Sequence, residues 1–197
     1  MSREGAPALV LASTSRYRKD LLARLYVPFV AAAPDCDEEA YKATGLAPRA
    51  LAETLALRKA ESLREAHPDA AILGGDQVAS IDDTILGKPG SEAAARAQLA
   101  LLAGRTHTLI TAVALLARGR ILRHTDVTRL TMRPLTAEQI ARYVATDQPL
   151  DCGGSYRLES LGVALFSRIE SEDHTAIVGL PLLALTAMLG EIGIVIP

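Results

Sequence analysis

Short apolar runs alternate with segments of helical periodicity along this chain. The apolar run at residues 8–12 predicts a buried strand, and leucines at helical spacing within 20–25 predict a helix after it. The alternation continues, with strands expected at 27–33, 70–73, 78–81, 84–86, 106–117, 121–131 and 162–169, and helices at 48–65, 92–103, 136–145 and 181–189. Because helical crossovers and hairpins both occur, the pattern predicts an α/β fold with a mixed sheet flanked by helices.

The segment GGDQV at residues 74–78 follows one of these strands, and GKP follows at 87–89. We expect Asp76 at the end of the strand, with the two glycines allowing a ligand to approach the backbone. A hairpin around Asp82 and Asp83 would return Lys88 toward Asp76. One carboxylate and one ammonium beside glycine-rich backbone suit a metal-bound polyphosphate, although the same residues are also common in ordinary turns.

A second candidate site is the segment STSRYRK at residues 13–19, where the first strand runs into the first helix. Free backbone N–H groups at a helix start bind phosphate, and Arg18 adds donors suited to phosphate oxygens. The alternative is that Ser13 or Ser15 caps the helix and the cations coat it. Three cations in four residues at a helix start oppose the helix dipole, which favours a bound anion.

Five segments in order resemble the Maf family of nucleotide pyrophosphatases: LASTSRYR (11–18), GDQV (75–78), GKP (87–89), GRTHT (104–108) and VGLPL (178–182). The resemblance implies hydrolysis of a nucleoside triphosphate to the monophosphate and pyrophosphate, with a divalent cation (Mg, Mn or Co) and Asp76 as the key carboxylate. It also implies an inosine-triphosphatase-like fold, in which helices flank an elongated mixed central sheet and a cleft separates two lobes.

Composition is consistent with one domain over residues 1–197. The net charge of −2 gives no reason to expect binding to nucleic acid or to a membrane. The nearly apolar run at 109–117 is far shorter than the roughly 20 residues of a spanning helix, so we expect a cytoplasmic protein. Cys36 and Cys152 lack the spacing of a metal or redox pair, so reduced thiols are expected. The expected partner is a small nucleotide, and a homodimer is one option for the assembly.

Two further charged residues gain weight from the resemblance. Glu38 lies in an acidic loop where the family carries an acidic residue, so it is either a metal ligand or part of a solvated loop. Lys59 lies in the predicted helix 48–65 and resembles the family's helix lysine, although such a lysine is commonly solvated. His107 is expected to pack or hydrogen-bond locally in the long hairpin.

The expected chemistry rests on positioning and electrostatics, because attack of water on a phosphoanhydride spreads charge over oxygens. Asp76 would orient the water or hold the ion, with Glu38 as a further metal ligand. Lys59 and Lys88 would stabilise the developing charge. Ser13, Ser15 and Arg18 would hold the phosphate tail. No histidine and aspartate partners for a nucleophilic serine are evident in the sequence.

Four residues resemble the branch of the family that hydrolyses 7-methyl-GTP, an activity that would clear modified nucleotides from the pool. Gln77 follows Asp76, Cys152 and Glu159 replace the lysine and the glutamine of the pyrimidine branch, and Tyr17 occupies an aromatic position. Glu159 can accept from the base's N1–H and exocyclic amine, and Tyr17 can stack on the cationic ring. Arg16 departs from the usual proline. A dTTP/UTP pyrophosphatase, or a non-catalytic nucleotide-binding regulator of cell division, are the alternatives.

Overall fold

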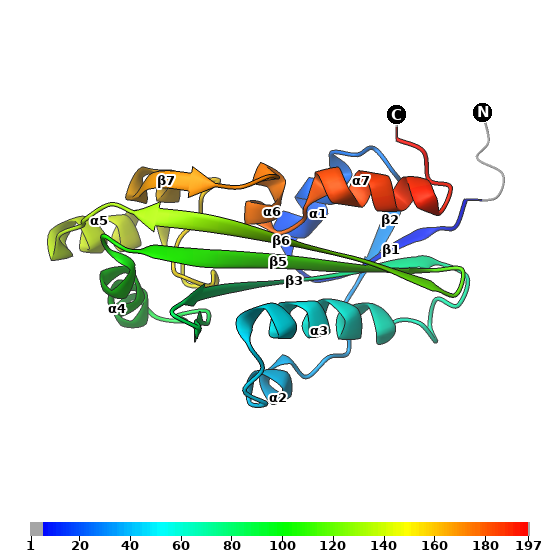
Figure 1. Cartoon of the computed structure of the whole chain (residues 1–197), viewed down its shortest axis with the longest axis horizontal. Helices are drawn as coiled ribbons and strands as arrows, with labels where there is room; N and C mark the ends of the chain where they lie inside the picture. Colours follow the sequence, from blue (N-terminus) through cyan, green and yellow to red (C-terminus); the bar gives the residue numbers. More distant parts are fainter. Residues whose placement is uncertain (1–5, 197) are drawn as a thin grey trace. The chain divides into compact units, whose positions relative to one another are not determined.

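The computed structural model describes residues 6–196 and contains a seven-stranded mixed sheet with helices beside it (Figure 1). The strand order is β2-β1-β3-β5-β6-β7, and β4 pairs with β3. In chain order the elements are β1 (Leu9–Ala12), α1 (Arg16–Ala23), β2 (Phe29–Ala32), α2 (Glu38–Lys42), α3 (Pro48–Glu61), β3 (Ala71–Ile81), β4 (Thr84–Leu86), α4 (Glu92–Leu102), β5 (Thr106–Ala117), β6 (Arg120–Met132), α5 (Ala137–Asp147), the 3-10 helix η1 (Leu161–Leu165), β7 (Phe166–Glu170), α6 (His174–Val178) and α7 (Leu182–Glu191).

The pairing of the strands confirms the predicted mixed α/β fold. β1 pairs in parallel with both β2 and β3, whereas β3 with β4 and β6 with β7 pair antiparallel. The chain divides into two compact units: the first comprises the chain up to Asp76, Thr111–Asp126 and the chain from Asp173, and the second comprises Gln77–Ile110 and Val127–Glu172. The single domain and the cleft expected from the sequence stay predictions.

The core of the first unit explains why its strands are so apolar. Alternate residues of β1 and β3 face one side, where Leu9, Leu11 and Leu73 pack with leucines of α1 and α7. The opposite side of β3 faces α3, as the tight approach of Gly74 to Ala56 demonstrates. Helices therefore cover both faces of these strands (Figure 1), which is the arrangement that near-continuous apolar strands require.

In the second unit, two antiparallel strand pairs and a helix pair form the framework. The hairpin of β3 and β4 that the sequence predicts is confirmed, with Ala79 paired to Leu86, and α4 packs against α5. β6 and β7 form a further antiparallel pair, with a register irregularity between Thr131 and Met132. The strand expected over 162–169 is wrong in its first part, because those residues form η1 and the strand begins only at Phe166.

Two short helices, α2 and α6, were not expected from the sequence. Each has five residues, too few for a periodic apolar stripe to be recognised. Both begin after an aspartate, Asp37 and Asp173, whose side chain accepts a hydrogen bond from a backbone N–H of the first turn. The N-cap aspartates were therefore the available signal. Glu38 consequently starts a helix, and the expectation of an acidic loop at this point is wrong.

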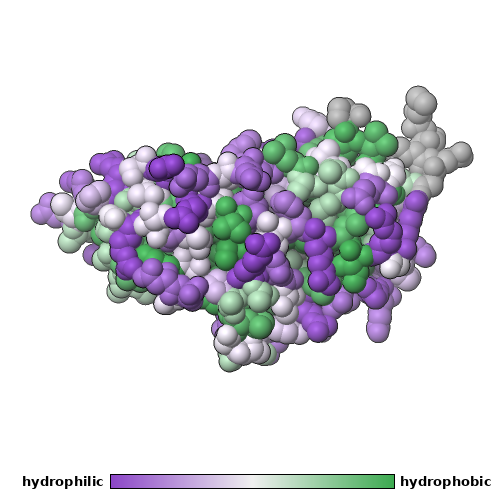
Figure 2. Space-filling view, viewed as in Figure 1, coloured by the Kyte–Doolittle hydropathy of each residue, from purple (hydrophilic) through white to green (hydrophobic). Residues whose placement is uncertain are grey.

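The surface mixes polar and apolar residues. Figure 2 shows hydrophilic and hydrophobic residues interspersed over the visible face. Scattered exposed apolar side chains are normal on folded proteins. Within residues 6–196, no helix combines the length and the apolar character needed to span a membrane. Cys36 and Cys152 are both free thiols, as expected.

Candidate active site

Asp76 lies in the middle of β3, not at its end. The strand runs without interruption from Ala71 to Ile81, so the predicted break at the two glycines is wrong. Its parallel neighbour β1, however, ends beside it: the last pair in the register joins Ala12 to Gly74. Asp76 therefore lies just beyond the carboxyl end of β1, a position where ligands commonly bind in α/β folds.

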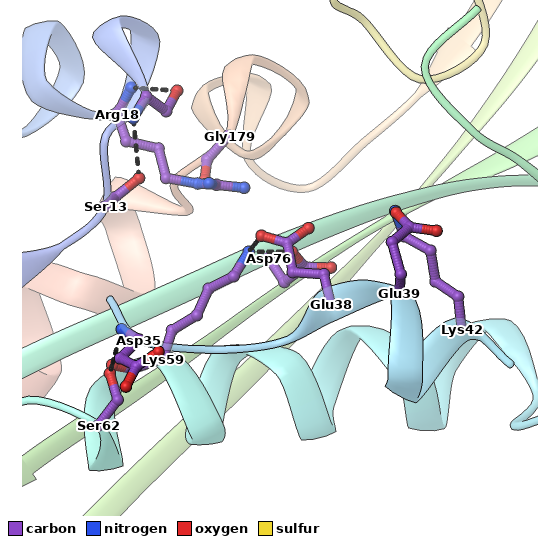
Figure 3. A network of polar contacts seen from close by, with 11 residues as sticks. Ser13, Arg18, Asp35, Glu38, Glu39, Lys42, Lys59, Ser62, Asp76 and Gly179 are labelled. Carbon is purple, nitrogen blue, oxygen red and sulfur yellow. Dashed lines mark hydrogen bonds and ion pairs between the residues drawn. The ribbon is translucent and has the colours of Figure 1, made fainter. Parts of the chain in front are cut away.

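Asp76 forms a buried ion pair with Lys59 of α3. The Lys59 ammonium lies 2.7 Å from Asp76 Oδ1 and 2.7 Å from Glu38 Oε1 (Figure 3). The side chains of Lys59 and Asp76 are 6% and 9% exposed, whereas Glu38 is 41% exposed. The structure thus brings together three residues that the sequence analysis selected separately, with a cation between two carboxylates and one side open to solvent.

Gly74 positions Lys59 by allowing α3 to lie directly on β3. A Cβ atom built on Gly74 would lie 2.1 Å from the carbonyl oxygen of Ala56 and 2.8 Å from the backbone nitrogen of Ala60. Both are backbone atoms of α3, one on each side of Lys59 in sequence. Gly74 therefore admits a helix, not a ligand as the sequence suggested, and the close approach lets the lysine reach Asp76.

The electrostatics of the pair follow from its burial. Burial raises the pKa of the Asp76 carboxyl, while the charges of Lys59 and Arg18 oppose that rise. Burial lowers the pKa of the Arg18 guanidinium, and the charges of Asp76 and Glu38 oppose that change. The site therefore holds desolvated charges of both signs. In such an environment these charges interact strongly with a charged substrate.

Arg18 is held in place by the loop before α7. Its Nε donates to the carbonyl oxygen of Gly179 at 3.1 Å (Figure 3). The same nitrogen would lie 3.5 Å from a Cβ atom on Gly75, so the guanidinium packs over the glycine that precedes Asp76. The bond to Gly179 uses Nε and neither of the terminal nitrogens, which are the donors that suit phosphate oxygens.

One buried carboxylate fixes the loop that contains Gly179. Asp173 accepts from the backbone N–H of Thr175 at 2.8 Å, from the Thr175 hydroxyl at 2.6 Å and from the backbone N–H of Leu183 at 2.8 Å. Burial raises the pKa of Asp173, but these hydrogen bonds outweigh it and leave the pKa lowered. Asp173 therefore ties the starts of α6 and α7 together, a role that the sequence analysis missed.

The serines of the turn between β1 and α1 hydrogen-bond locally. The Ser13 hydroxyl accepts from the backbone N–H of Ser15 at 3.1 Å, and the Ser15 hydroxyl accepts from that of Arg18 at 3.5 Å. Ser15 is the N-cap of α1, so the capping interpretation is confirmed. The first turn of α1 contains no acidic residue. Phosphate binding by Ser13, Ser15 and Arg18 stays a prediction.

Asp76 and Glu38 fit a hard divalent cation. Their oxygens already converge on one positive group, the Lys59 ammonium. Magnesium commonly takes one or two protein carboxylates and completes its shell with phosphate and water. Within residues 6–196, no cluster of three or more histidine, cysteine or acidic side chains has the arrangement of a metal site. This donor set suits an ion that arrives with a polyphosphate, not a permanent zinc centre.

The remaining predicted site residues stay predictions. Lys88 is exposed after the β3–β4 hairpin, Gln77 is half-buried in β3, and Glu159 is exposed in a turn before η1. These three belong to the second unit, whereas Tyr17 and the Asp76 cluster belong to the first. Tyr17 is half-buried in α1. The guanidinium carbon of Arg16 lies 5.3 Å from the centre of its ring, a contact that the sequence analysis did not expect.

His107 plays the local role expected of it. The ring is buried, and its Nε2 is 2.8 Å from the Tyr156 hydroxyl. Burial lowers the pKa of His107 to about 4, so the ring is neutral at physiological pH. Tyr156 also stacks edge-on with Phe166 at 4.9 Å between ring centroids. These aromatic contacts pack the second unit and supply no titratable group near pH 7.

Comparison with known proteins identifies the family. Residues 8–192 match the family model described as Maf-like protein. The chain is 48% identical to a 7-methyl-GTP pyrophosphatase of Bdellovibrio bacteriovorus over 92% of this chain and 95% of that protein. It is 46% identical to a protein of the same name from Xanthomonas oryzae over 97% of this chain and 100% of that protein, and 47% identical to one from Cupriavidus pinatubonensis over 98% and 97%. The five-segment resemblance is therefore confirmed, and the chain belongs to the Maf-like protein family.

Proposed function

We propose that this chain is a nucleoside triphosphate pyrophosphatase that hydrolyses 7-methyl-GTP to 7-methyl-GMP and pyrophosphate. The observation that carries the proposal is the buried Asp76–Lys59 pair, with Glu38 on the same ammonium, just beyond the carboxyl end of β1. The 7-methyl-GTP pyrophosphatases that are 46–48% identical over nearly the whole chain support the same substrate.

In the proposed reaction, water attacks a phosphoanhydride, and charge builds on the phosphate oxygens in the transition state. Asp76 orients the attacking water or holds the metal, because its buried carboxylate is fixed by Lys59. Lys59 stabilises the developing negative charge from a preorganised position. Arg18 holds the polyphosphate together with the turn of Ser13 and Ser15. Lys88 is a further candidate for stabilising this charge.

A divalent cation would be held by Asp76 and Glu38, with Mg, Mn or Co as the candidates. When bound, it neutralises polyphosphate charge and polarises the anhydride. Lys59 would remain beside the same carboxylates as a permanent counter-charge. The positive charges of Lys59 and Arg18 favour the ionised form of Asp76, although burial raises the pKa of this carboxyl.

Recognition of the methylated base is assigned to Glu159 and Tyr17, with Gln77 beside Asp76. Methylation at N7 gives the purine a positive charge and makes its N1–H a better donor. An exposed carboxylate such as Glu159 can accept from N1–H and the exocyclic amine side by side. Tyr17 offers its aromatic ring for stacking, and the Arg16 guanidinium already lies over that ring.

The test is to incubate purified protein with magnesium and each of 7-methyl-GTP, GTP, UTP and dTTP, and to measure released pyrophosphate. The highest kcat/KM on 7-methyl-GTP is expected. Preference for UTP or dTTP would assign the chain to the pyrimidine-specific alternative. Nucleotide binding without pyrophosphate release from any of the four would contradict the enzymatic proposal and favour the non-catalytic regulator.

A further inference from the structure

A buried aspartate at the end of α5 binds the turn that carries Glu159. Asp147 is only 7% exposed, although it is the last residue of the helix. A carboxylate is unfavourable there for two reasons: burial removes water, and the negative end of the helix dipole repels it. Such a residue must be compensated by several donors.

Three side chains compensate Asp147, and two of them come from the turn. The Tyr143 hydroxyl donates to Asp147 Oδ2 at 2.7 Å, and the Ser160 hydroxyl donates to Oδ1 at 2.6 Å. The Arg157 Nε lies 3.6 Å from Oδ2. Ser160 and Arg157 flank Glu159 at one and two residues, so the carboxylate holds the chain on both sides of it.

The backbone of the turn is fixed as well. The Tyr143 hydroxyl, which donates to Asp147, also accepts from the backbone N–H of Arg157 at 3.1 Å. The backbone N–H of Ser160 donates to the Arg157 carbonyl at 3.2 Å. A Cβ atom on Gly162 would lie 2.3 Å from that same carbonyl oxygen, so the chain folds tightly back on itself. The exposed Glu159 thus lies in a turn whose backbone and side chains are hydrogen-bonded to α5.

We propose that Asp147, together with Tyr143 and Ser160, is a positioning site that holds Glu159 in one conformation and thereby sets the preference for a 7-methylguanine base. The inference rests on the proposed function and deepens it. Because Glu159 must meet two donors of the base at once, a small displacement of its backbone weakens both hydrogen bonds. None of the three positioning residues needs to touch the nucleotide.

The variants Ser160→Ala and Tyr143→Phe test this by removing one hydroxyl each. The ratio of kcat/KM on 7-methyl-GTP to that on GTP should fall about fivefold, the effect of a typical hydrogen bond. The fall should come from a KM that rises more for 7-methyl-GTP, whose N1–H is the stronger donor, than for GTP, with kcat unchanged. Ser80→Ala is the matched control, since it removes a buried hydroxyl that bonds Thr108 at 2.9 Å in the same unit; the ratio should be unchanged.

A double mutant separates positioning from simple packing. If Asp147 acts through Glu159, Ser160→Ala should lower the ratio in the wild type but not in a Glu159→Gln background. A wild type without any preference for 7-methyl-GTP would overturn the proposed function itself. The wild type could prefer 7-methyl-GTP and lose that preference in Glu159→Gln, while Ser160→Ala and Tyr143→Phe keep it. That outcome would overturn the positioning role alone. Equal losses on both substrates with a lower melting temperature would also overturn it.

Discussion

Gly74 and Ala56 lie so close that a single methyl group between them would not fit: a Cβ atom on Gly74 would lie 2.1 Å from the Ala56 carbonyl oxygen. The contact joins β3 to α3 backbone to backbone. It fixes how deeply α3 lies on the strand, and so whether the Lys59 ammonium reaches Asp76 at 2.7 Å. One glycine thus links the packing of the first unit to its chemistry.

The first prediction is that Gly74→Ala destabilises the protein and lowers its activity. The clash is with backbone atoms, so α3 must move away, at a cost of about 1–3 kcal/mol or more. The melting temperature and kcat should both fall. Gly190→Ala is the control, because a Cβ there meets nothing within 4 Å and lies in α7; it should leave the protein as stable or more stable. Wild-type stability and activity of Gly74→Ala would contradict the packing argument.

The second prediction is that Asp76→Asn reduces kcat by roughly a hundredfold or more while the protein stays folded. The amide keeps the shape of the side chain but cannot carry the charge that orients water or binds a cation. Lys59 keeps Glu38 as a partner, so the buried ammonium is not left alone. Glu39→Gln is the control, since the Glu39 side chain is exposed and pairs with Lys42 of α2. A folded Asp76→Asn variant that keeps most of its activity would contradict the proposed role of Asp76 in the reaction.

Much of this site could be predicted from the sequence, because Asp76 and Arg18 occur in motifs with a clear chemical meaning and the resemblance to the family singled out Lys59. The strand through Asp76 could not, since two consecutive glycines indicate a break unless a helix packs directly on them. Glu38 was expected in a loop, because a five-residue helix has no periodicity to detect. The roles of Asp173 and Asp147 depend on contacts that only tertiary structure creates, such as Asp147 with Ser160.

The third prediction concerns stability at acidic pH. His107 has a folded pKa lowered to about 4 by burial, against about 6.5 when unfolded. Between these values the unfolded chain binds more protons, so stability is lost as the pH falls from about 6.5 to about 4, on the order of 3 kcal/mol in full. Denaturant titrations at a series of pH values measure this. In His107→Gln the slope over that window should flatten; an unchanged slope would show that other groups cause it.

The fourth prediction is that activity disappears on chelation and returns with magnesium, manganese or cobalt. Lys59, Lys88 and Arg18 cannot by themselves neutralise a triphosphate. Glu38→Gln should raise the metal concentration needed for half-maximal activity, because it removes one of the two carboxylates proposed to hold the metal, the one that pairs with Lys59 beside Asp76. Isothermal titration with the metal and a non-hydrolysable nucleotide provides a second measurement. Full turnover in excess chelator would contradict metal dependence.

The last prediction concerns the ring of Tyr17, which Arg16 already contacts at 5.3 Å. A cationic base and the Arg16 guanidinium would compete for this ring. Arg16→Ala should therefore lower KM for 7-methyl-GTP by about two- to fivefold, the size of an exposed cation–π contact, and leave GTP unchanged. Tyr17→Ala should raise KM for 7-methyl-GTP with little effect on kcat, because stacking is equal in the ground and transition states. Lys19→Ala controls for charge near the phosphate turn. Equal shifts for both nucleotides in Arg16→Ala and Lys19→Ala would mean that Arg16 acts through its charge on the phosphates and not through the ring.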